Sequence, residues 1–209
     1  MKNPIIVIVD SGVGNIWSVL KAVQRFAPGA VVTEDPAVVT AADAIILPGV
    51  GSFKAGMDGL NVRGLIEPLQ QAAKKGVPIL GICLGAQLLL DRGYEFGEHE
   101  GLGIIKGEVV PFTGLPAGSK IPVIDWQEVV PHAKEARQLL GTSTTSYFYF
   151  VHSYVLKPDE ESNSFATTSY NGYSYCAVVG KGNIFGTQFH PEKSGEAGLQ
   201  LIKNFISII

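Results

Sequence analysis

The segment PILGICLGAQ, residues 78–87, joins a short apolar run to the start of an amphipathic segment. The run Pro78–Ile82 predicts a buried strand, and Leu84–Asp91 predicts a helix that begins directly after Cys83. A glycine stands two residues before Cys83 and another two residues after it, as a tight strand-to-helix turn requires. The segment therefore predicts a strand, a sharp turn that presents a cysteine, and a helix.

The residues on the N-terminal side of this turn repeat the alternation of strand and helix. Ile5–Val9 and Ala44–Leu47 are short, continuous apolar runs, which is the pattern of strands buried on both faces. Asn15–Phe26 and Gly64–Lys75 have the length and apolar spacing of helices, and Gly76 suits the end of the second one. This alternation predicts an α/β domain with a central, mostly parallel sheet flanked by helices.

The C-terminal half is richer in strands and turns. The expected strands are Lys106–Pro111, Glu128–Val130, Tyr147–Val151, Phe165–Ser169, Tyr175–Val179 and Ile184–Gln188. Asn171-Gly172 is typical of a two-residue hairpin turn, so part of the sheet should be mixed or antiparallel. Gly195–Ile206 should be a helix packed on the sheet. Since no repeat or linker interrupts the pattern, residues 1–209 are predicted to form a single domain.

The composition restricts the class of protein. Hydrophobic residues make up 46% of the chain and charged residues 17%, which predicts a large buried sheet, an apolar patch covered by a partner, or both. The net charge of -3 gives no electrostatic support for binding nucleic acid. No apolar run reaches the length of a membrane-spanning helix, and there are only two cysteines. We therefore expect a cytoplasmic protein that contacts neither nucleic acid nor a membrane.

Cys83 is the candidate nucleophile. A glycine, any residue, a nucleophile, any residue and a glycine form an elbow that holds the nucleophile out at the end of the sheet in a strained conformation. The backbone N–H of Leu84 can then help to stabilise an oxyanion. The alternative is a buried and inert thiol at a strand–helix junction, which is common for free cysteines. Cys176 lacks this setting and is interpreted as an ordinary strand residue.

His190 and Glu192 are the candidate base and its orienting acceptor, both of which a nucleophilic cysteine requires. His190 is one of four histidines and follows a predicted strand in GTQFHPEK, residues 186–193. Pro191 disfavours a helical conformation at His190, and residues two apart on an extended segment point the same way. Glu192 can therefore hold the imidazole in one tautomer. The alternative is a His-Pro-Glu turn on the surface without a role in catalysis.

Together these segments resemble class I glutamine amidotransferases, which combine such a cysteine elbow with a His-Pro-Glu segment near the C-terminus. Within that class, the chain is most similar to the glutaminase subunits of imidazole glycerol phosphate synthase, an enzyme of histidine biosynthesis. The matching segments are DSGVGN (10–15), LPGVG (47–51), GICLGAQ (81–87), YFVHSY (149–154) and GTQFHPEKS (186–194). The resemblance implies a flavodoxin-like fold, the triad Cys83, His190 and Glu192, and glutamine as the substrate.

The resemblance also implies which residues surround the nucleophile. Gly49-Val50-Gly51 resembles the oxyanion strand, where a peptide flip near Val50 aims an N–H at the tetrahedral intermediate, together with that of Leu84. Glycines make such a flip easy, and the donor is expected to be the N–H of Gly51. No metal or organic cofactor is implied, and His152 is interpreted as structural.

Five residues are expected to contact the glutamine substrate: Gly49, Gln87, Glu95, Ser153 and Tyr154. Of these, Glu95 suits the α-ammonium group, and Ser153 and Tyr154 match positions near the α-carboxylate. Without the resemblance, Gln87 would be interpreted as an exposed helix residue and Glu95 as a solvated loop charge.

The implied partner is a (β/α)8-barrel cyclase subunit, which would form a heterodimer with this chain and receive ammonia through a channel. Trp126 and Lys193 match positions near that interface. The chain departs from the family at PVIDWQ, residues 122–127, where the family usually has PHMGWN. We expect this segment to face the partner and not the nucleophile. The departure leaves open a paralogue that supplies ammonia to another synthase, for example for amino sugars of surface polysaccharides.

Two other interpretations also remain open. One is a cysteine hydrolase of γ-glutamyl or peptide bonds that acts alone. The other is a non-catalytic regulatory module, against which the intact set of Cys83, His190 and Glu192 argues. Because the resemblance is to a family that channels ammonia, glutamine hydrolysis should be gated. We therefore expect the oxyanion strand not to be formed in the isolated subunit.

Overall fold

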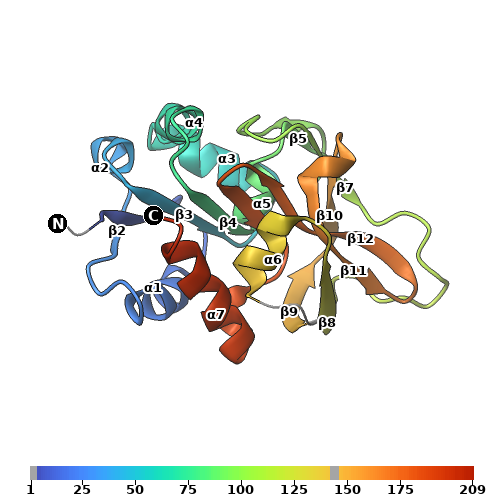
Figure 1. Ribbon diagram of the computed structural model, residues 1–209. Coiled ribbons are helices and arrows are strands. Elements are labelled where there is room, and N and C mark those ends of the chain that lie inside the picture. Colours follow the sequence, from blue (N-terminus) through green and yellow to red (C-terminus); the bar gives the residue numbers. More distant parts are fainter. Residues whose placement is uncertain (1–3, 142–145) are drawn as a thin grey trace.

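The computed structural model describes residues 4–141 and 146–209. A mixed sheet runs through the molecule and carries helices on both faces (Figure 1). Its parallel part has the order β2-β1-β3-β4-β13. The five strands are β2 (Val31–Thr33), β1 (Ile6–Val9), β3 (Ala44–Gly49), β4 (Ile79–Cys83) and β13 (Ile184–Thr187). This is the strand order of a flavodoxin-like, doubly wound sheet, so the predicted α/β class is confirmed.

The second half of the chain extends the sheet with mainly antiparallel strands. Beyond β13 the path continues through β12 (Tyr173–Lys181), β10 (Tyr154–Pro158), β7 (Gly107–Pro111), β5 (Arg92–Gly93) and β6 (His99–Glu100). A branch leads from β12 through β11 (Ser164–Tyr170) and β8 (Val123–Pro131) to β9 (Ser146–His152). Asn171-Gly172 joins β11 to β12 with φ angles of 49° and 81°, which confirms the predicted hairpin turn.

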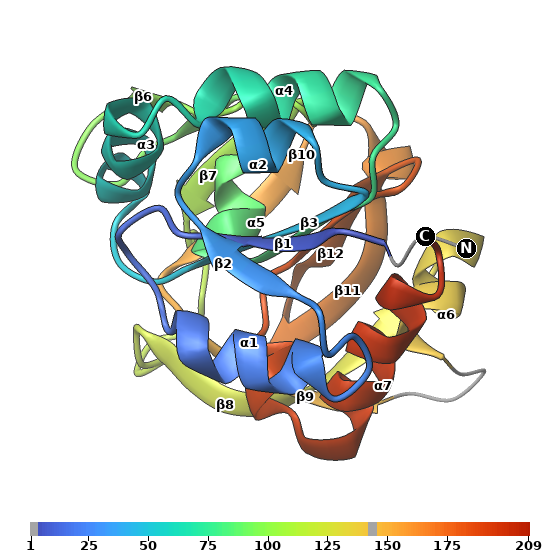
Figure 2. The same ribbon diagram turned by 90° about the vertical axis from the view of Figure 1, so that its left-hand side faces the viewer.

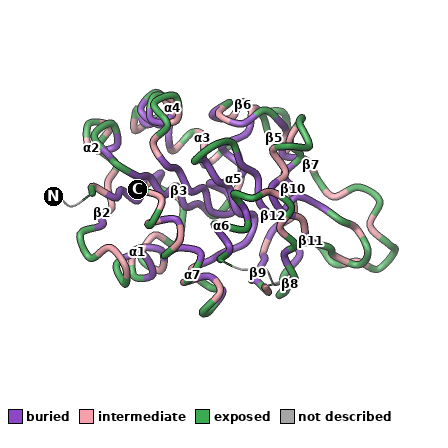
Figure 3. The backbone as a smooth tube through the Cα atoms, viewed as in Figure 1, coloured by how far each residue is buried: buried purple, intermediate pink, exposed green. Residues whose placement is uncertain are grey.

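Helices cover both faces of the parallel strands (Figure 2). One face carries α2 (Pro36–Thr40), α3 (Phe53–Val62), α4 (Ile66–Lys74) and α5 (Leu84–Leu88). The other carries α1 (Ile16–Gln24) and α7 (Gly195–Ile206), and α6 (Lys134–Leu140) packs beside them on α7, β8 and β11. Strand β1 sends Ile6 and Ile8 into one core and Val7 and Val9 into the other, because successive side chains point to opposite faces. Strands β1, β3, β4 and β13 are buried throughout (Figure 3), which accounts for much of the high apolar content.

Several elements differ from those expected. The helix predicted over Leu84–Asp91 ends at Leu88, and the strand predicted over Glu128–Val130 is the last part of the longer β8. Helix α3 is hidden in the sequence because two glycines weaken its helical pattern. The packing requires one of them, since a Cβ added at Gly59 would lie 2.0 Å from the carbonyl oxygen of Ser11.

Short elements account for the remaining differences. Strands β2, β5 and β6 and helices α2 and α6 have no counterpart among the predictions, because their periodic pattern spans too few residues. Strand β10, which is as long as β4, was not predicted either. Among the described residues, no helix has the length and apolar character that a bilayer-spanning segment needs.

Candidate active site

Cys83 stands where β4 turns into α5. Its φ of 52° and ψ of -108° form a combination that residues with a side chain rarely adopt. The strain is imposed by close packing of α5 on the strand ends. A Cβ added at Gly85 would lie 1.7 Å from the carbonyl oxygen of Leu47, and one added at Gly81 would lie 2.7 Å from that of Gly85. The predicted strand–turn–helix geometry is thus confirmed.

His190 and Glu192 meet just after β13. Atom Nδ1 of His190 lies 2.9 Å from Oε1 of Glu192, and both side chains are 2% exposed. The contact was expected from an extended segment, but the backbone differs. His190 itself is extended, whereas Pro191 begins the 3-10 turn η2 (Pro191–Lys193), and this turn carries the carboxylate back to the ring. The proline therefore fixes the pair through a turn and not through a strand.

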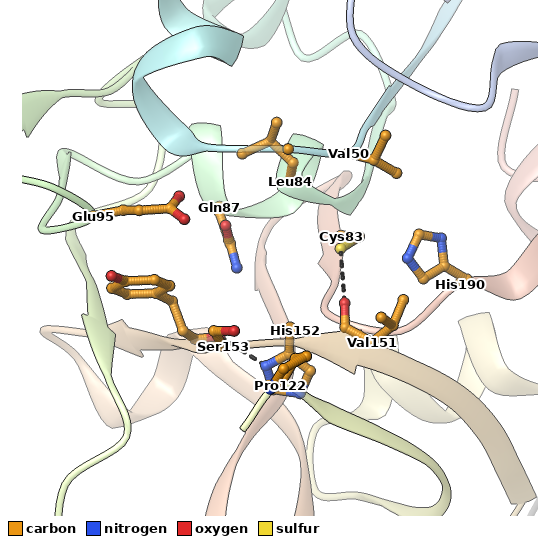
Figure 4. A pocket seen from close by; sticks show the side chains of 12 residues that line it. Val50, Cys83, Leu84, Gln87, Glu95, Pro122, Val151, His152, Ser153 and His190 are labelled. Carbon is orange, nitrogen blue, oxygen red and sulfur yellow. Dashed lines mark hydrogen bonds between the residues drawn. The ribbon is translucent and has the colours of Figure 1, made fainter. Parts of the chain in front are cut away.

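The second ring nitrogen of His190 is available to the nucleophile. Nε2 is buried and has no hydrogen-bond partner in the part of the chain that the structure describes. Figure 4 shows the ring beside Cys83, with one nitrogen turned toward the sulfur. Burial opposes protonation of the ring, but the proximity of Cys83 and the hydrogen bond and charge of Glu192 outweigh burial and raise the pKa of His190 to about 9. At neutral pH the ring therefore keeps a proton that it takes from the thiol, as an imidazolium that can later give this proton to a leaving group.

Replacing Glu192 with glutamine should destabilise the fold in a pH-dependent way. Because the folded-state pKa of His190, about 9, lies above its usual value of 6.5, the protonated ring stabilises the fold fully below pH 6.5. That contribution is lost as the pH rises through about 9. We expect Glu192→Gln to lower the free energy of unfolding by about 1–2 kcal/mol at pH 6 and by much less at pH 10.

Urea denaturation at the two pH values measures this difference. The matched control is Glu196→Gln, which removes an exposed carboxylate at the start of α7 and should leave the pH dependence unchanged. An equal loss of stability at pH 6 and pH 10 in Glu192→Gln would show that the carboxylate does not support the charge on His190.

A cavity of about 300 Å³ opens beside Cys83 (Figure 4). Its lining consists of Val50, Gly51, Cys83, Leu84, Gln87, Glu95, Pro122, Val151, His152, Ser153, Tyr154 and His190. The structure thus brings together the residues that the sequence suggests for nucleophile, base, oxyanion and substrate contacts, with two exceptions. Glu192 lies behind His190, and Gly49 does not line the cavity. A Cβ added at Gly49 would lie 3.0 Å from the Cβ of Leu84, so this glycine allows α5 to approach β3.

Glu95 and Gln87 bring polar groups to the cavity (Figure 4), and neither is the solvated residue that the sequence alone would suggest. Oε2 of Glu95 accepts a hydrogen bond from the backbone N–H of Phe53, 2.8 Å away at the start of α3. This contact orients the carboxylate. Gln87 is buried, and its Nε2 donates to Oε1 of Gln188 at 3.2 Å.

Gln188 is a site residue that the sequence analysis missed. Its side chain is fully buried, and its Nε2 lies 3.9 Å from Sγ of Cys83. The sequence does contain a signal, because Gln188 is the last residue of the predicted strand Ile184–Gln188 and lies two residues before His190. A polar residue at the end of a strand points to the site at the strand ends.

The expectation that residues 122–127 face away from the nucleophile is wrong in part. Pro122 lines the cavity together with Cys83. Within β8, Ile124 and Trp126 are 62% and 50% exposed, whereas Val123 and Gln127 are buried. Only the outward residues of the segment are therefore available to a partner.

Trp126 and Lys193, the two expected interface residues, converge on Tyr149. The ring centroids of Trp126 and Tyr149 are 6.0 Å apart, and Nζ of Lys193 lies 5.9 Å from the centroid of the Tyr149 ring. Lys193 belongs to η2, the turn that also carries Glu192. This exposed cluster is therefore one turn of backbone away from the candidate triad.

Comparison with known proteins agrees with this geometry. The family model described as "Glutamine amidotransferase class-I" matches residues 7–208. A curated protein of Legionella pneumophila (strain Lens), "Imidazole glycerol phosphate synthase subunit HisH 1", is 44% identical over 208 residues, which cover 96% of this chain and 98% of that protein. The HisH subunit of Symbiobacterium thermophilum is 46% identical over 200 residues, covering 96% and 92% of the two chains.

Solved structures resemble the chain in fold. A crystal structure of a glutamine amidotransferase matches with a TM-score of 0.74 at 17% identity and covers 97% of both chains. The structure of PurLQS from Thermotoga maritima contains a chain that matches with a TM-score of 0.73 at 19% identity, covering 99% of both. At such low identities the likeness concerns the fold alone.

Proposed function

Since the chain belongs to the class I glutamine amidotransferase family, we propose that it is the glutaminase subunit of an imidazole glycerol phosphate synthase. It hydrolyses glutamine to glutamate and ammonia, and the ammonia enters histidine biosynthesis. The observation that carries the proposal is the arrangement of Cys83, His190 and Glu192 at one end of a small cavity. Both cysteines of the chain are free, which supports the reducing cytoplasm as its compartment.

The reaction follows from the arrangement of the three side chains. His190 takes the proton of Cys83 through Nε2, and the sulfur attacks the side-chain amide carbon of glutamine. The N–H groups of Leu84 and Gly51 hold the oxyanion of the tetrahedral intermediate. His190 then returns its proton to the leaving ammonia. Water, with its proton accepted by His190, hydrolyses the γ-glutamyl thioester and releases glutamate.

Glu192 and Gln188 support the reacting pair in this proposal. Glu192 occupies Nδ1 of His190, so the proton carried there cannot be given to the substrate and Nε2 alone exchanges protons with Cys83. Gln188 lies between Gln87 and the sulfur: its Oε1 accepts a hydrogen bond from Gln87, and its Nε2 faces Sγ of Cys83. Neither residue forms a bond to the substrate.

Glu95 is proposed to bind the α-ammonium group of glutamine. Replacing it with glutamine keeps an acceptor for the Phe53 N–H but removes the negative charge. Loss of a charge-assisted hydrogen bond should raise KM for glutamine about tenfold and leave kcat nearly unchanged. Steady-state kinetics measures KM and kcat, and thermal denaturation checks that the variant is folded. The control is Glu98→Gln, which alters a surface ion pair with Arg92 and should leave KM unchanged. An equal KM for Glu95→Gln and the native protein would show that Glu95 does not bind the substrate.

The acceptor subunit is proposed to be a (β/α)8-barrel cyclase. The curated relatives are named as subunits of a synthase, so a second subunit is implied. Ile124 and Trp126 on the outer face of β8, with Lys193, supply an apolar and cationic surface beside the triad. Partner residues that cover this surface would lie close to the point where ammonia is released.

The decisive test is glutamate release with and without a histidine-pathway cyclase subunit and its nucleotide ligand. We expect stimulation of at least tenfold, because the oxyanion strand at Val50 and Gly51 is proposed to form only when the partner binds. High activity of the isolated subunit would contradict gating. No stimulation, with Cys83 still labelled by a glutamine-analogue diazo ketone, would identify a paralogue that serves another synthase.

A further inference from the structure

The chain changes strand partners at Ser153, in the wall of the cavity. Strand β9 ends at His152 and pairs with β8, whereas β10 begins at Tyr154 and pairs with β7 and β12. Residues 151–154 all line the cavity. Sγ of Cys83 lies 3.8 Å from the carbonyl oxygen of Val151, which can accept a hydrogen bond from the thiol. The bend at Ser153 therefore sets the position of the wall that faces the nucleophile.

The side chain of His152 spans this bend. Its Nδ1 lies 2.8 Å from the carbonyl oxygen of Tyr154, and its Nε2 lies 3.1 Å from the hydroxyl of Tyr175. Because a carbonyl oxygen only accepts, Nδ1 must carry a proton. Burial is the main cause that lowers the pKa of His152 to about 4, so at neutral pH the ring is uncharged and Nε2 has no proton. The hydroxyl of Tyr175 consequently donates to Nε2.

The same reasoning fixes the orientation of Gln127 on β8. The structure places Oε1 of its buried amide 2.6 Å from the hydroxyl of Tyr175 and 3.1 Å from that of Thr168, and a half-turn of the amide would exchange this oxygen with the NH2 group. Tyr175 has given its only proton to His152, and Thr168 donates its own to the carbonyl of Glu128, 2.7 Å away. Both hydroxyls can then only accept, so the matching of donors with acceptors requires the half-turn that places the NH2 group on them.

This orientation also suits the other end of the Gln127 amide. That end has no hydrogen-bond partner within residues 4–141 and 146–209. If it were the NH2 group, two buried donors would be unpaired; with the NH2 group on the hydroxyls, a single carbonyl oxygen is unpaired instead. An under-satisfied carbonyl is the more tolerable case in a protein interior.

We propose that Gln127, Tyr175 and His152 form a hydrogen-bond relay with one direction, which ends on the Tyr154 carbonyl and positions residues 151–154 for glutamine. The inference rests on the proposed function, because that function makes this wall part of the substrate site. The three side chains are positioning residues that act on the substrate through Ser153 and Tyr154. Gln127 also adjoins Trp126, whose side chain is exposed, so the relay begins on the strand that carries the proposed partner surface.

Tyr175→Phe tests the relay by removing a single hydroxyl. Measured with the partner subunit present, KM for glutamine should rise about fivefold while kcat stays within twofold, because the nucleophile is untouched. The matched control is Tyr173→Phe, two residues along β12, which should change neither constant.

Gln127→Leu should raise KM by a similar factor. The double variant Gln127→Leu with Tyr175→Phe should raise KM by little more, because both changes break one relay. An unchanged KM in Tyr175→Phe, or effects that multiply in the double variant, would overturn the proposal.

Nitrogen-15 NMR of the native protein and of Tyr175→Phe tests the direction of the relay. At pH 7 the ring of His152 should be neutral with its proton on Nδ1, and Tyr175→Phe should remove the hydrogen-bond shift at Nε2. A proton on Nε2 in the native protein would overturn the assignment. This measurement needs no enzymatic activity. If the native protein released no glutamate under any condition, the proposed function would fail, and the tautomer would still decide whether the relay exists.

Discussion

Replacing Cys83 with alanine is expected to reduce glutamine hydrolysis by a factor on the order of 10⁴ or more. Alanine removes the only atom that can form the thioester, and neither His190 nor the oxyanion donors can replace it. The cavity and the surface around Trp126 keep their shape, so the variant should still bind the partner. Any reaction that the partner performs with free ammonia should continue at its native rate.

Cys176→Ala is the matched control for this prediction. Cys176 is the other free cysteine, and burial in β12 raises the pKa of its thiol to about 12, so it is inert at neutral pH. Its removal should leave glutamate release unchanged. Glutamate release with glutamine, and product formation with ammonium salts, would be measured for both variants. Residual hydrolysis in Cys83→Ala near the native rate would disprove the covalent mechanism.

Gly85→Ala should be the most damaging substitution for the fold of the site. The added Cβ would lie 1.7 Å from the carbonyl oxygen of Leu47, which belongs to the backbone of β3 and cannot rotate away. Helix α5 would have to move off the strand ends, and Leu84 and Cys83 would move with it. Overpacking of this severity should cost about 3 kcal/mol or more and lower Tm by roughly 10 °C.

Gly29→Ala provides the control for adding a methyl group at a glycine. An added Cβ at Gly29 has no atom within 4 Å, so the effect should stay within about 0.5 kcal/mol. Thermal denaturation and glutamate release would be measured for both variants and compared. If Gly85→Ala unfolded at the same temperature as Gly29→Ala, the close approach of α5 to β3 would not constrain the elbow.

The parts of the site that could be predicted depend on contacts between neighbours in the sequence. The elbow around Cys83 is encoded by the two flanking glycines and the apolar run before them. The pairing of His190 with Glu192 was also predicted, although the reason given was incomplete, because the contact depends on the 3-10 turn that Pro191 begins. In both cases the interacting groups lie within a few residues, so the backbone alone limits where they can go.

The parts that could not be predicted depend on contacts between distant segments. Gln188 lies 101 residues from Gln87, with which it shares a hydrogen bond, and Gln127 lies 48 residues from Tyr175. Whether such side chains meet is decided by the strand order, and no local pattern encodes it. The same holds for Pro122, which enters the cavity because β8 is paired with β9 beside it.

The sequence by itself determined the α/β class, the strained turn at Cys83 and the pairing of a base with a carboxylate, because each follows from side-chain periodicity or from the geometry of adjacent residues. The tertiary structure decided which residues share one cavity, which side chains meet the hydroxyl of Tyr175, and which face of β8 remains exposed. These depend on burial and on matching donors with acceptors across strands that are far apart in the chain, and such matching exists only once the sheet is assembled.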